Sequence, residues 1–153
     1  MFSGSVTLAN TIGTDSYGWT IVSSNPNKQT ELFYSVGTIA IGSWVELNSS
    51  MQATTTFAAG QKSIGVVSSI FVDGYDNQIA DGPILVQTVG YAFVKCTGNT
   101  INANDLLIPD TNGKVKATTF NPLSPTPIIG CALEASNNTI ANMVKMKIQI
   151  CGD

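Results

Sequence analysis

The second half of this chain repeats the first half. Four segments recur in the same order, 39–47 as 101–109, 54–57 as 117–120, 64–66 as 129–131 and 84–90 as 146–152. Their landmark residues are 62 to 65 positions apart, a spread that unequal loops in two copies of one strand set would produce. Recurrence at a fixed spacing is the signature of a duplicated structural unit. The repeat predicts two copies of one β unit, at about 37–92 and 99–153.

The strand signal is clearest near the C-terminus, where apolar and polar residues alternate from Val144 to Cys151. A period of two predicts a strand with one buried face. The corresponding segment 83–90 is more continuously apolar and starts at Pro83, where a missing N–H is tolerated, so we expect it to be buried on both faces. Gly90 separates it from the strand-like run 91–96 and predicts a bend between the two copies.

Turn residues punctuate the rest of the chain. Asn112-Gly113 lies between two short apolar segments and is the strongest hairpin signal, because a type I′ turn needs positive φ at both central positions. Turn signals at this density leave room for short strands, and no segment shows helix caps together with a period of 3.6. We therefore predict an all-β fold, with residues 37–153 forming a single β domain.

Residues 1–36 lie outside the repeat and form a leader or N-terminal arm, with the polar stretch 23–30 as a linker. The leader is too poor in apolar residues to fold alone, yet it can pair with something. It can add a strand to its own domain, or lie as an extended arm on a neighbouring subunit. In the second case it would carry the partner contacts, for which we select Phe2, Val6, Leu8, Tyr17 and Trp19.

Composition excludes several partner classes. The chain has 153 residues, of which 11% are charged, and its net charge is −3. All its basic side chains are lysines, and they form no basic stripe that could neutralise phosphates, so we expect no nucleic-acid partner. The N-terminus lacks the pattern of a secretory signal, and no apolar run reaches the ~20 residues of a membrane-spanning helix. We expect neither secretion nor a membrane partner.

Catalytic chemistry is also missing. The chain has no histidine, which excludes Ser-His-Asp and Cys-His arrangements. Its three cysteines (Cys96, Cys131 and Cys151) have no metal-ligand spacing, and we interpret them as small apolar residues of a reduced core. We predict that the protein is not an enzyme and uses no cofactor or metal.

Two other patterns have a functional and a structural interpretation. Asp73, Asp76 and Asp81 form a cluster that could ligate calcium, but turn-forming Asp beside Gly explains it without a ligand. Trp44 occupies the position of Leu106 in the other copy, which favours a core role over a platform for sugar stacking.

Lone glycines stand inside apolar runs at equivalent points of the two copies, at Gly65 and Gly130. They predict close backbone packing in a strand and not a phosphate-binding loop.

Five segments carry a resemblance to a known family: 42–47, 104–108, 110–117, 129–134 and 147–152. Their order resembles the small capsid decoration, or cement, proteins of tailed bacteriophages. Those proteins share a turn leading into a "Gly-Asp-Leu-Val"-like strand, an "Asp-Gly-Lys-Val" hairpin, an "Ile-Gly-Val-Ala-Leu-Glu" strand and a final apolar strand ending in glycine. The second copy carries the pattern best, from about residue 99 to 153.

The resemblance implies a compact β-barrel or β-tulip, with a sandwich as the other form open to an all-β chain. It also implies a homotrimer that binds the major capsid protein on the outer surface of the virion, after synthesis in the host cytoplasm. Such proteins stabilise the head by clamping neighbouring capsomers, often through an N-terminal arm. Residues 1–36 would be that arm.

Other functional classes stay open at this point. A carbohydrate-binding β-sandwich module is the main alternative, with Tyr17, Trp19, Tyr34, Trp44 and Tyr75 as its candidate aromatic residues. A phage fibre or tail component is a variant of the structural interpretation. An enzyme comes third, because it would have to work with carboxylates alone.

Overall fold

The computed structural model describes residues 10–14, 20–23, 29–58, 61–98, 101–119, 127–136 and 142–150. Within these ranges the chain forms β-strands and one short 3-10 turn, Thr111–Gly113, and no α-helix. The predicted all-β class is confirmed.

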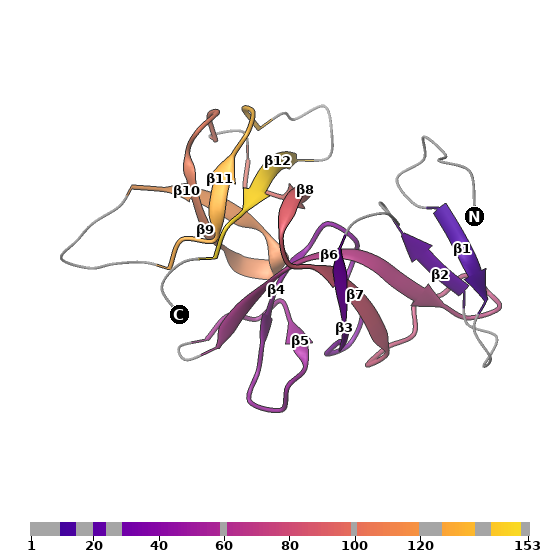
Figure 1. Cartoon of the computed structure of the whole chain (residues 1–153). Helices are drawn as coiled ribbons and strands as arrows, with labels where there is room; N and C mark the ends of the chain where they lie inside the picture. Colours follow the sequence, from indigo (N-terminus) through magenta and orange to yellow (C-terminus); the bar gives the residue numbers. More distant parts are fainter. Residues whose placement is uncertain are drawn as a thin grey trace.

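The strands form two sheets that lie side by side (Figure 1). The first, seven-stranded sheet contains β1 (Asn10–Thr14), β2 (Thr20–Ser23), β3 (Thr30–Tyr34), β4 (Trp44–Leu47), β5 (Ala53–Thr54), β6 (Lys62–Val72) and β7 (Pro83–Gln87). The second, five-stranded sheet contains β8 (Gly90–Lys95), β9 (Leu106–Pro109), β10 (Val115–Thr118), β11 (Gly130–Ala132) and β12 (Met143–Ile148).

The two sheets share one order of strand pairing. In the first, β3 pairs with β7, β7 with β6, β6 with β4 and β4 with β5, all antiparallel. In the second, β8 pairs with β12, β12 with β11, β11 with β9 and β9 with β10, again antiparallel. We call β3–β7 unit 1 and β8–β12 unit 2. The sequence repeat is therefore a structural repeat.

Each unit also curves until its two edges meet. A parallel bridge joins Ser35, just after β3, to Ala53 of β5 in unit 1. The equivalent bridge in unit 2 joins Cys96, just after β8, to Val115 of β10. The edges meet at one residue pair and not along a full ladder, so a sandwich-like arrangement of two curved sheets describes the fold.

Strand pairing places the start of each copy earlier than the sequence repeat does. Unit 1 begins with Thr30–Tyr34, which the sequence analysis assigned to the N-terminal extension, and unit 2 begins with Gly90–Lys95. These first strands share almost no residue identities, so comparing the two halves could not detect them. Unit 1 ends at Gln87 and unit 2 starts at Gly90. Gly90 has a positive φ of +86°, which suits the predicted bend.

The register makes the two units equivalent residue by residue. Trp44 pairs with Val66 as Leu106 pairs with Cys131, and Val45 pairs with Gly65 as Leu107 pairs with Gly130. The loop before the second strand is also held in the same way, since Gly42 N donates to Val67 O and Asn104 N donates to Ala132 O, both at 2.8 Å. The predicted match of Trp44 with Leu106 is confirmed. The predicted match of 84–90 with 146–152 is off by two residues, because Val66 pairs with Gln87 as Cys131 pairs with Lys147. Gln87 therefore corresponds to Lys147 and not to Gln149.

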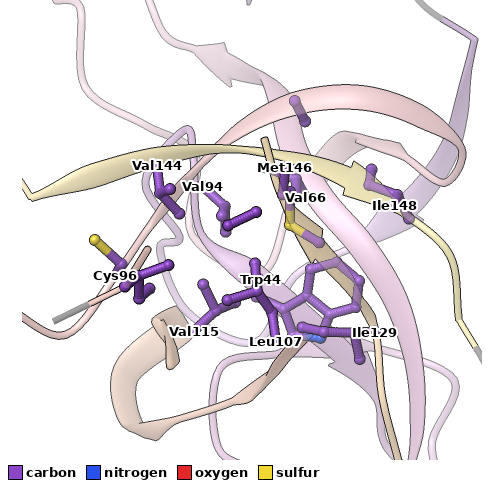
Figure 2. Close-up of a cluster of buried hydrophobic side chains, with 13 residues drawn as sticks. Trp44, Val66, Val94, Cys96, Leu107, Val115, Ile129, Val144, Met146 and Ile148 are labelled. Carbon is purple, nitrogen blue, oxygen red and sulfur yellow. The ribbon is translucent and has the colours of Figure 1, made fainter. Parts of the chain in front are cut away.

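The described residues form two apolar cores, and one is shared between the units. Unit 1 has its own cluster: Ile39, Val45, Ala53, Val67, Ile84 and Val86. The larger cluster belongs to unit 2 but also contains Trp44 and Val66 of unit 1 (Figure 2). Trp44 has an exposed fraction of 0%, so its predicted core role is confirmed, although the core that it fills is that of the other unit.

Three local predictions are also confirmed. Asn112 and Gly113 have φ of +57° and +72°, as a type I′ turn between β9 and β10 requires. In β12 the side chains at 144, 146 and 148 are buried, which gives the strand one buried face. In β7, Ile84 and Val86 are fully buried and Leu85 is partly buried.

The N-terminal segment adds a hairpin to unit 1. β1 pairs with β2, and β2 pairs with the end of β6 from Ser69 to Val72. β2 and β4 therefore follow one another along the same edge of β6. Of the two arrangements considered for the leader, the described strands adopt the first, an extension of the chain's own sheet. Figure 1 shows this hairpin on the side of unit 1 away from unit 2.

Candidate functional site

The five residues selected as partner contacts, Phe2, Val6, Leu8, Tyr17 and Trp19, lie outside the described residues. Of the predicted linker at 23–30, residues 24–28 do so too, whereas Ser23 ends β2 and Thr30 begins β3. For β1 and β2 the structure describes the backbone alone, which is enough to place the hairpin on the edge of β6.

Exposed apolar side chains gather on the first strand of each unit. On β3, Leu32 and Tyr34 each have an exposed fraction of 54%, and on β8, Tyr91 and Phe93 reach 50% and 51%. The alternate residue of β8, Val94, is fully buried in the core of unit 2. Both strands therefore carry large apolar side chains on two faces, one towards the core and one towards solvent. These outward faces are the candidate interaction surface.

The two outward faces differ in their neighbours. On β3, Leu32 pairs with the partly buried Leu85 and Tyr34 pairs with Pro83, so that face is neutral and apolar. On β8, Phe93 pairs with Lys145 and Tyr91 with Lys147, which places two cationic side chains beside two aromatic rings. Contiguous exposed apolar surface on a soluble domain usually marks an interaction site.

The aspartates at 73, 76 and 81 form turns and not a ligand set. Asp73 Oδ1 accepts hydrogen bonds from Tyr75 N at 2.8 Å and from Asn77 N at 3.1 Å, which closes the loop between β6 and β7. Asp81 Oδ1 is used elsewhere, because it accepts from Gly37 N at 2.6 Å. Asp76 and Asp81 adopt positive φ, as turn-forming Asp can. The structural interpretation of this cluster accounts for its contacts.

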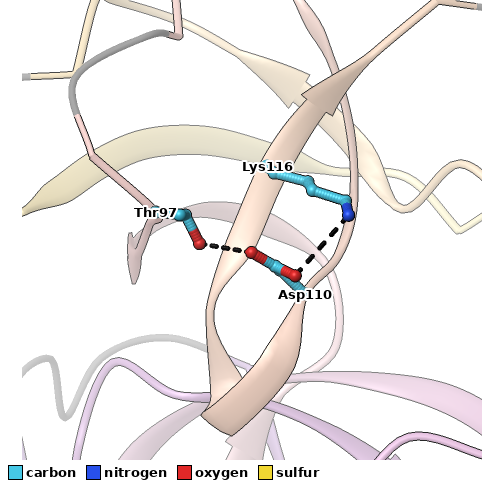
Figure 3. A network of polar contacts seen from close by, with 3 residues as sticks. All are labelled: Thr97, Asp110 and Lys116. Atoms are coloured by element: carbon cyan, nitrogen blue, oxygen red, sulfur yellow. Dashed lines mark hydrogen bonds and ion pairs between the residues drawn. The ribbon is translucent and has the colours of Figure 1, made fainter.

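A small polar network joins the end of β8 to the β9–β10 hairpin of unit 2 (Figure 3). The Thr97 hydroxyl donates to Asp110 Oδ2, and Lys116 Nζ lies 3.6 Å from Asp110 Oδ1. The hydrogen bond from Thr97 is the main cause that lowers the pKa of Asp110. The network connects the end of β8 to the β9–β10 hairpin, so its role is structural.

One carboxylate is buried beside the contact between the units. Glu46 on β4 has an exposed fraction of 8%, and the Ser63 hydroxyl donates to its Oε2 at 3.0 Å. The same hydroxyl oxygen accepts from the indole Nε1 of Trp44 at 3.4 Å. Burial raises the pKa of Glu46, with the hydrogen bond from Ser63 acting in the opposite direction. No second carboxylate of the described chain joins it to form an acid–base pair.

The cysteines within the described residues have different surroundings. Cys96 is buried in the core of unit 2, and its thiol donates to Asn142 O at 3.0 Å. Burial raises the pKa of this thiol, as expected of an unreactive core residue. Cys131 is free and partly exposed on the outer face of β11, so the predicted core role is wrong for this residue. Cys151 lies outside the described residues.

The aromatic residues proposed for sugar binding do not form a common platform. Trp44 is fully buried, Tyr34 lies on β3, and Tyr75 lies on the β6–β7 loop with an exposed fraction of 87%. Tyr17 and Trp19 lie outside the described residues.

Two searches of the described residues bear on other classes of site. No group of three or more potential ligands (Asp, Glu, Cys or His) is close enough in that part of the chain to hold a metal ion. No helix there is long and apolar enough to span a bilayer.

Comparison with known proteins gives no match, either among protein-family models or among curated proteins.

The exposed faces of β3 and β8 are the feature that sequence reasoning missed. Both strands read as mixed apolar runs, Glu31-Leu-Phe-Tyr34 and Tyr91-Ala-Phe-Val94, and such runs are equally typical of strands buried on both sides. The signal that distinguishes them is topological, because each is the first strand of its unit and pairs in a ladder on one side only.

Proposed function

We propose that this chain is a structural protein of a phage virion that binds the outer surface of the capsid between major capsid proteins and stabilises the shell. It is not an enzyme in this proposal, and its recognition surface is the sheet exterior together with the N-terminal extension. The proposal rests on the resemblance of the second repeat to capsid decoration proteins.

One structural observation supports it most. The large apolar side chains on β3 and β8 face outward from two equivalent strands, Leu32 and Tyr34 on one and Tyr91 and Phe93 on the other. A protein that acts by covering another protein needs such exposed apolar and aromatic side chains more than it needs a cavity.

The hairpin at the N-terminus supports the same role. β2 is held on β6 by backbone pairing over Thr20 to Ser23, and such pairing can be offered to any exposed strand edge. In this proposal the N-terminal extension reaches the capsid, with Phe2, Val6, Leu8, Tyr17 and Trp19 as the contacts.

The energetic basis is mass action. A protein that binds the assembled lattice and not the free subunits shifts the assembly equilibrium toward the shell. Many copies on one shell, each touching two capsid subunits, add to the effect. Because 11% of the residues are charged, we expect binding to depend weakly on salt.

The test is cosedimentation with capsids of the encoding phage that were assembled without this chain. We expect saturable binding to the expanded shell and none to unassembled major capsid protein. A matched variant that starts at Gln29 removes the hairpin but keeps β3, and we expect it to stay folded and to bind at least tenfold more weakly.

Two results would contradict the proposal. One is no binding to the shell at concentrations at which the chain is folded by circular dichroism. The other is saturable binding to a glycan array that competes with any shell binding, which would favour a carbohydrate-binding module.

A further inference from the structure

The contact between the two units of one chain defines a surface and a complementary end. Gly42 O accepts a hydrogen bond from Lys95 N at 2.8 Å, and Trp44 and Val66 enter the core of unit 2. Gly113 is so near that a Cβ added to it would lie 2.8 Å from the Cβ of Ser43. We call Gly42, Ser43, Trp44 and Val66 the insertion face of unit 1, and Lys95, Gly113 and Met143 the receiving end of unit 2.

Met143 belongs to this end because the Gly42 backbone packs against it. A Cβ added to Gly42 would lie 2.6 Å from the terminal methyl carbon of Met143. The receiving end is the open end of the unit 2 core, where the indole of Trp44 lies near Leu107, Val115 and Ile129 (Figure 2).

Because the units are equivalent, unit 2 has an insertion face of its own. The strand register assigns Leu106 to Trp44 and Cys131 to Val66, and the matching loop hydrogen bonds assign Asn104 to Gly42. Trp44 and Val66 have exposed fractions of 0% and 2%, whereas Leu106 and Cys131 are partly exposed. Among the described residues, the insertion face of unit 2 is therefore less covered than that of unit 1.

Unit 1 likewise has a receiving end. In unit 1 Tyr34 pairs with Pro83, and in unit 2 Lys95 pairs with Met143. Tyr34 therefore corresponds to Lys95, and Pro83 corresponds to Met143. Met51 lies in the turn between β4 and β5 with φ of +62° and corresponds to Gly113 with φ of +72°. The receiving end of unit 1 is thus formed by Tyr34, Met51 and Pro83.

This end is exposed at Tyr34 and Met51, while Pro83 is buried. Tyr34 and Met51 have exposed fractions of 54% and 69%, and Val36 beside them is 44% exposed. In the core behind them Ile64 is partly buried, while the equivalent Ile129 of unit 2 is fully buried beneath Trp44. Three of the large apolar residues exposed in the described chain therefore gather at this end, and no described residue fills it as Trp44 fills the core of unit 2.

We propose that the insertion face of unit 2 in one copy docks on the receiving end of unit 1 in a second copy, and so repeats between chains the contact that joins the units within a chain. The occupant is a second copy because the interface already present in the chain shows how a unit of this fold fits another. This proposal does not rest on the proposed function, although Tyr34 belongs both to the receiving end and to the exposed face of β3 that we propose for capsid binding.

The contact between chains differs from the internal one in size. Leu106 is smaller than Trp44, and Asn104 and Met51 replace the two glycines that allow the closest approach inside the chain. The contact between chains is therefore looser, and association depends on protein concentration. Asp105 takes the place of Ser43 and carries a charge, whereas Leu106, Tyr34, Met51 and Pro83 are uncharged. None of these residues can form an ion pair with Asp105, so the association depends little on salt.

The contact is heterologous, because the two copies use different surfaces. Such contacts form a closed ring when the rotation from copy to copy closes, and an open filament when it does not. Each copy in either assembly keeps one insertion face and one receiving end engaged, apart from the ends of an open filament.

The test uses two variants of the full chain in sedimentation velocity experiments up to about 1 mM, where even contacts with millimolar Kd are populated. Tyr34→Glu places a charge on the receiving end, and Leu106→Glu places one on the insertion face of unit 2. Tyr75→Glu is the control, because Tyr75 lies on the β6–β7 loop outside both surfaces. Cys131→Glu replaces Leu106→Glu should the latter fail to fold by circular dichroism.

We expect the native chain and Tyr75→Glu to associate as concentration rises, and each of the other variants to remain monomeric. An equimolar mixture of Tyr34→Glu and Leu106→Glu should form a dimer and stop there, because each retains the one surface that the other lacks. A native chain that stays monomeric throughout the range would overturn the proposal. So would variants that associate like the native chain, or a mixture that stays monomeric.

Discussion

Gly65 and Gly130 show at the residue scale why the two units share one strand geometry. A Cβ at Gly65 would overlap the carbonyl oxygen of Gln87, and a Cβ at Gly130 would overlap that of Lys147. Both glycines let their strand, β6 or β11, pack backbone against backbone on the next strand at the same point. The prediction of close packing made from the sequence is confirmed in both copies.

Replacing either glycine by alanine should therefore be costly. We expect Gly65→Ala and Gly130→Ala each to destabilise the fold by about 3 kcal/mol or more, because the added methyl meets backbone that cannot move aside. Gly74→Ala is the matched control, since nothing lies within 4 Å of a Cβ there, and its effect should stay within about 0.5 kcal/mol. Urea unfolding measures all three, and equal effects at 65 and 74 would contradict the packing argument.

Glu46 predicts a pH dependence at the same scale. Its pKa is raised by burial, so the folded state binds this proton more tightly than the unfolded state. The contribution of Glu46 to stability is therefore favourable at low pH and is lost as pH rises from the unfolded pKa through the folded pKa.

The matching experiment uses Glu46→Gln. This variant keeps an oxygen that accepts from Ser63 and removes the buried charge, so we expect it to be more stable than the native chain at pH 7. The difference should shrink as pH falls below the unfolded pKa of about 4.3 for Glu. Unfolding free energies measured across this range decide the point, and a Glu46→Gln variant that is less stable at pH 7 would refute it.

At the scale of elements, β4 and β9 occupy equivalent places in their units, but their first residues differ in how much they contribute to the core. Trp44 at the start of β4 fills the core of unit 2, whereas Leu106 at the start of β9 is partly exposed. The two positions therefore separate the contact between units from the role of the strand itself.

We expect Trp44→Ala to cost about 3–5 kcal/mol, as large core truncations do. Leu106→Ala, at the equivalent position, should cost about 1 kcal/mol. Thermal unfolding of both variants measures the contrast. Similar losses at the two positions would mean that Trp44 does not hold the units together.

The sequence predicts the elements that are marked by local residue patterns, but not the features that depend on which strands pair. The duplication, the Asn112-Gly113 turn and the alternation in β12 are local patterns, and each was predictable. The starting strands β3 and β8 were not detected as equivalent, because Leu32 and Phe93, or Tyr34 and Lys95, share only their place in the pairing order. The candidate surface was missed for the same reason, since exposure of Leu32 and Phe93 depends on which strand lies at an edge.

At the scale of the whole molecule, two equivalent units share one core through an inserted tryptophan and expose sheet faces. The β1–β2 hairpin extends from the far side of unit 1 (Figure 1). A body of this kind presents broad surfaces on several sides. That arrangement suits a protein that bridges neighbouring subunits of a lattice, which is the function that we propose.

The most direct test is the heat stability of shells assembled without this chain, measured by the temperature at which they disassemble as the chain is added. Binding at 100 times Kd stabilises the bound state by about 2.7 kcal/mol per site. We therefore expect the disassembly temperature to rise with concentration until the sites are filled. A disassembly temperature that does not change at any concentration of folded chain would contradict the proposed role in capsid stabilisation.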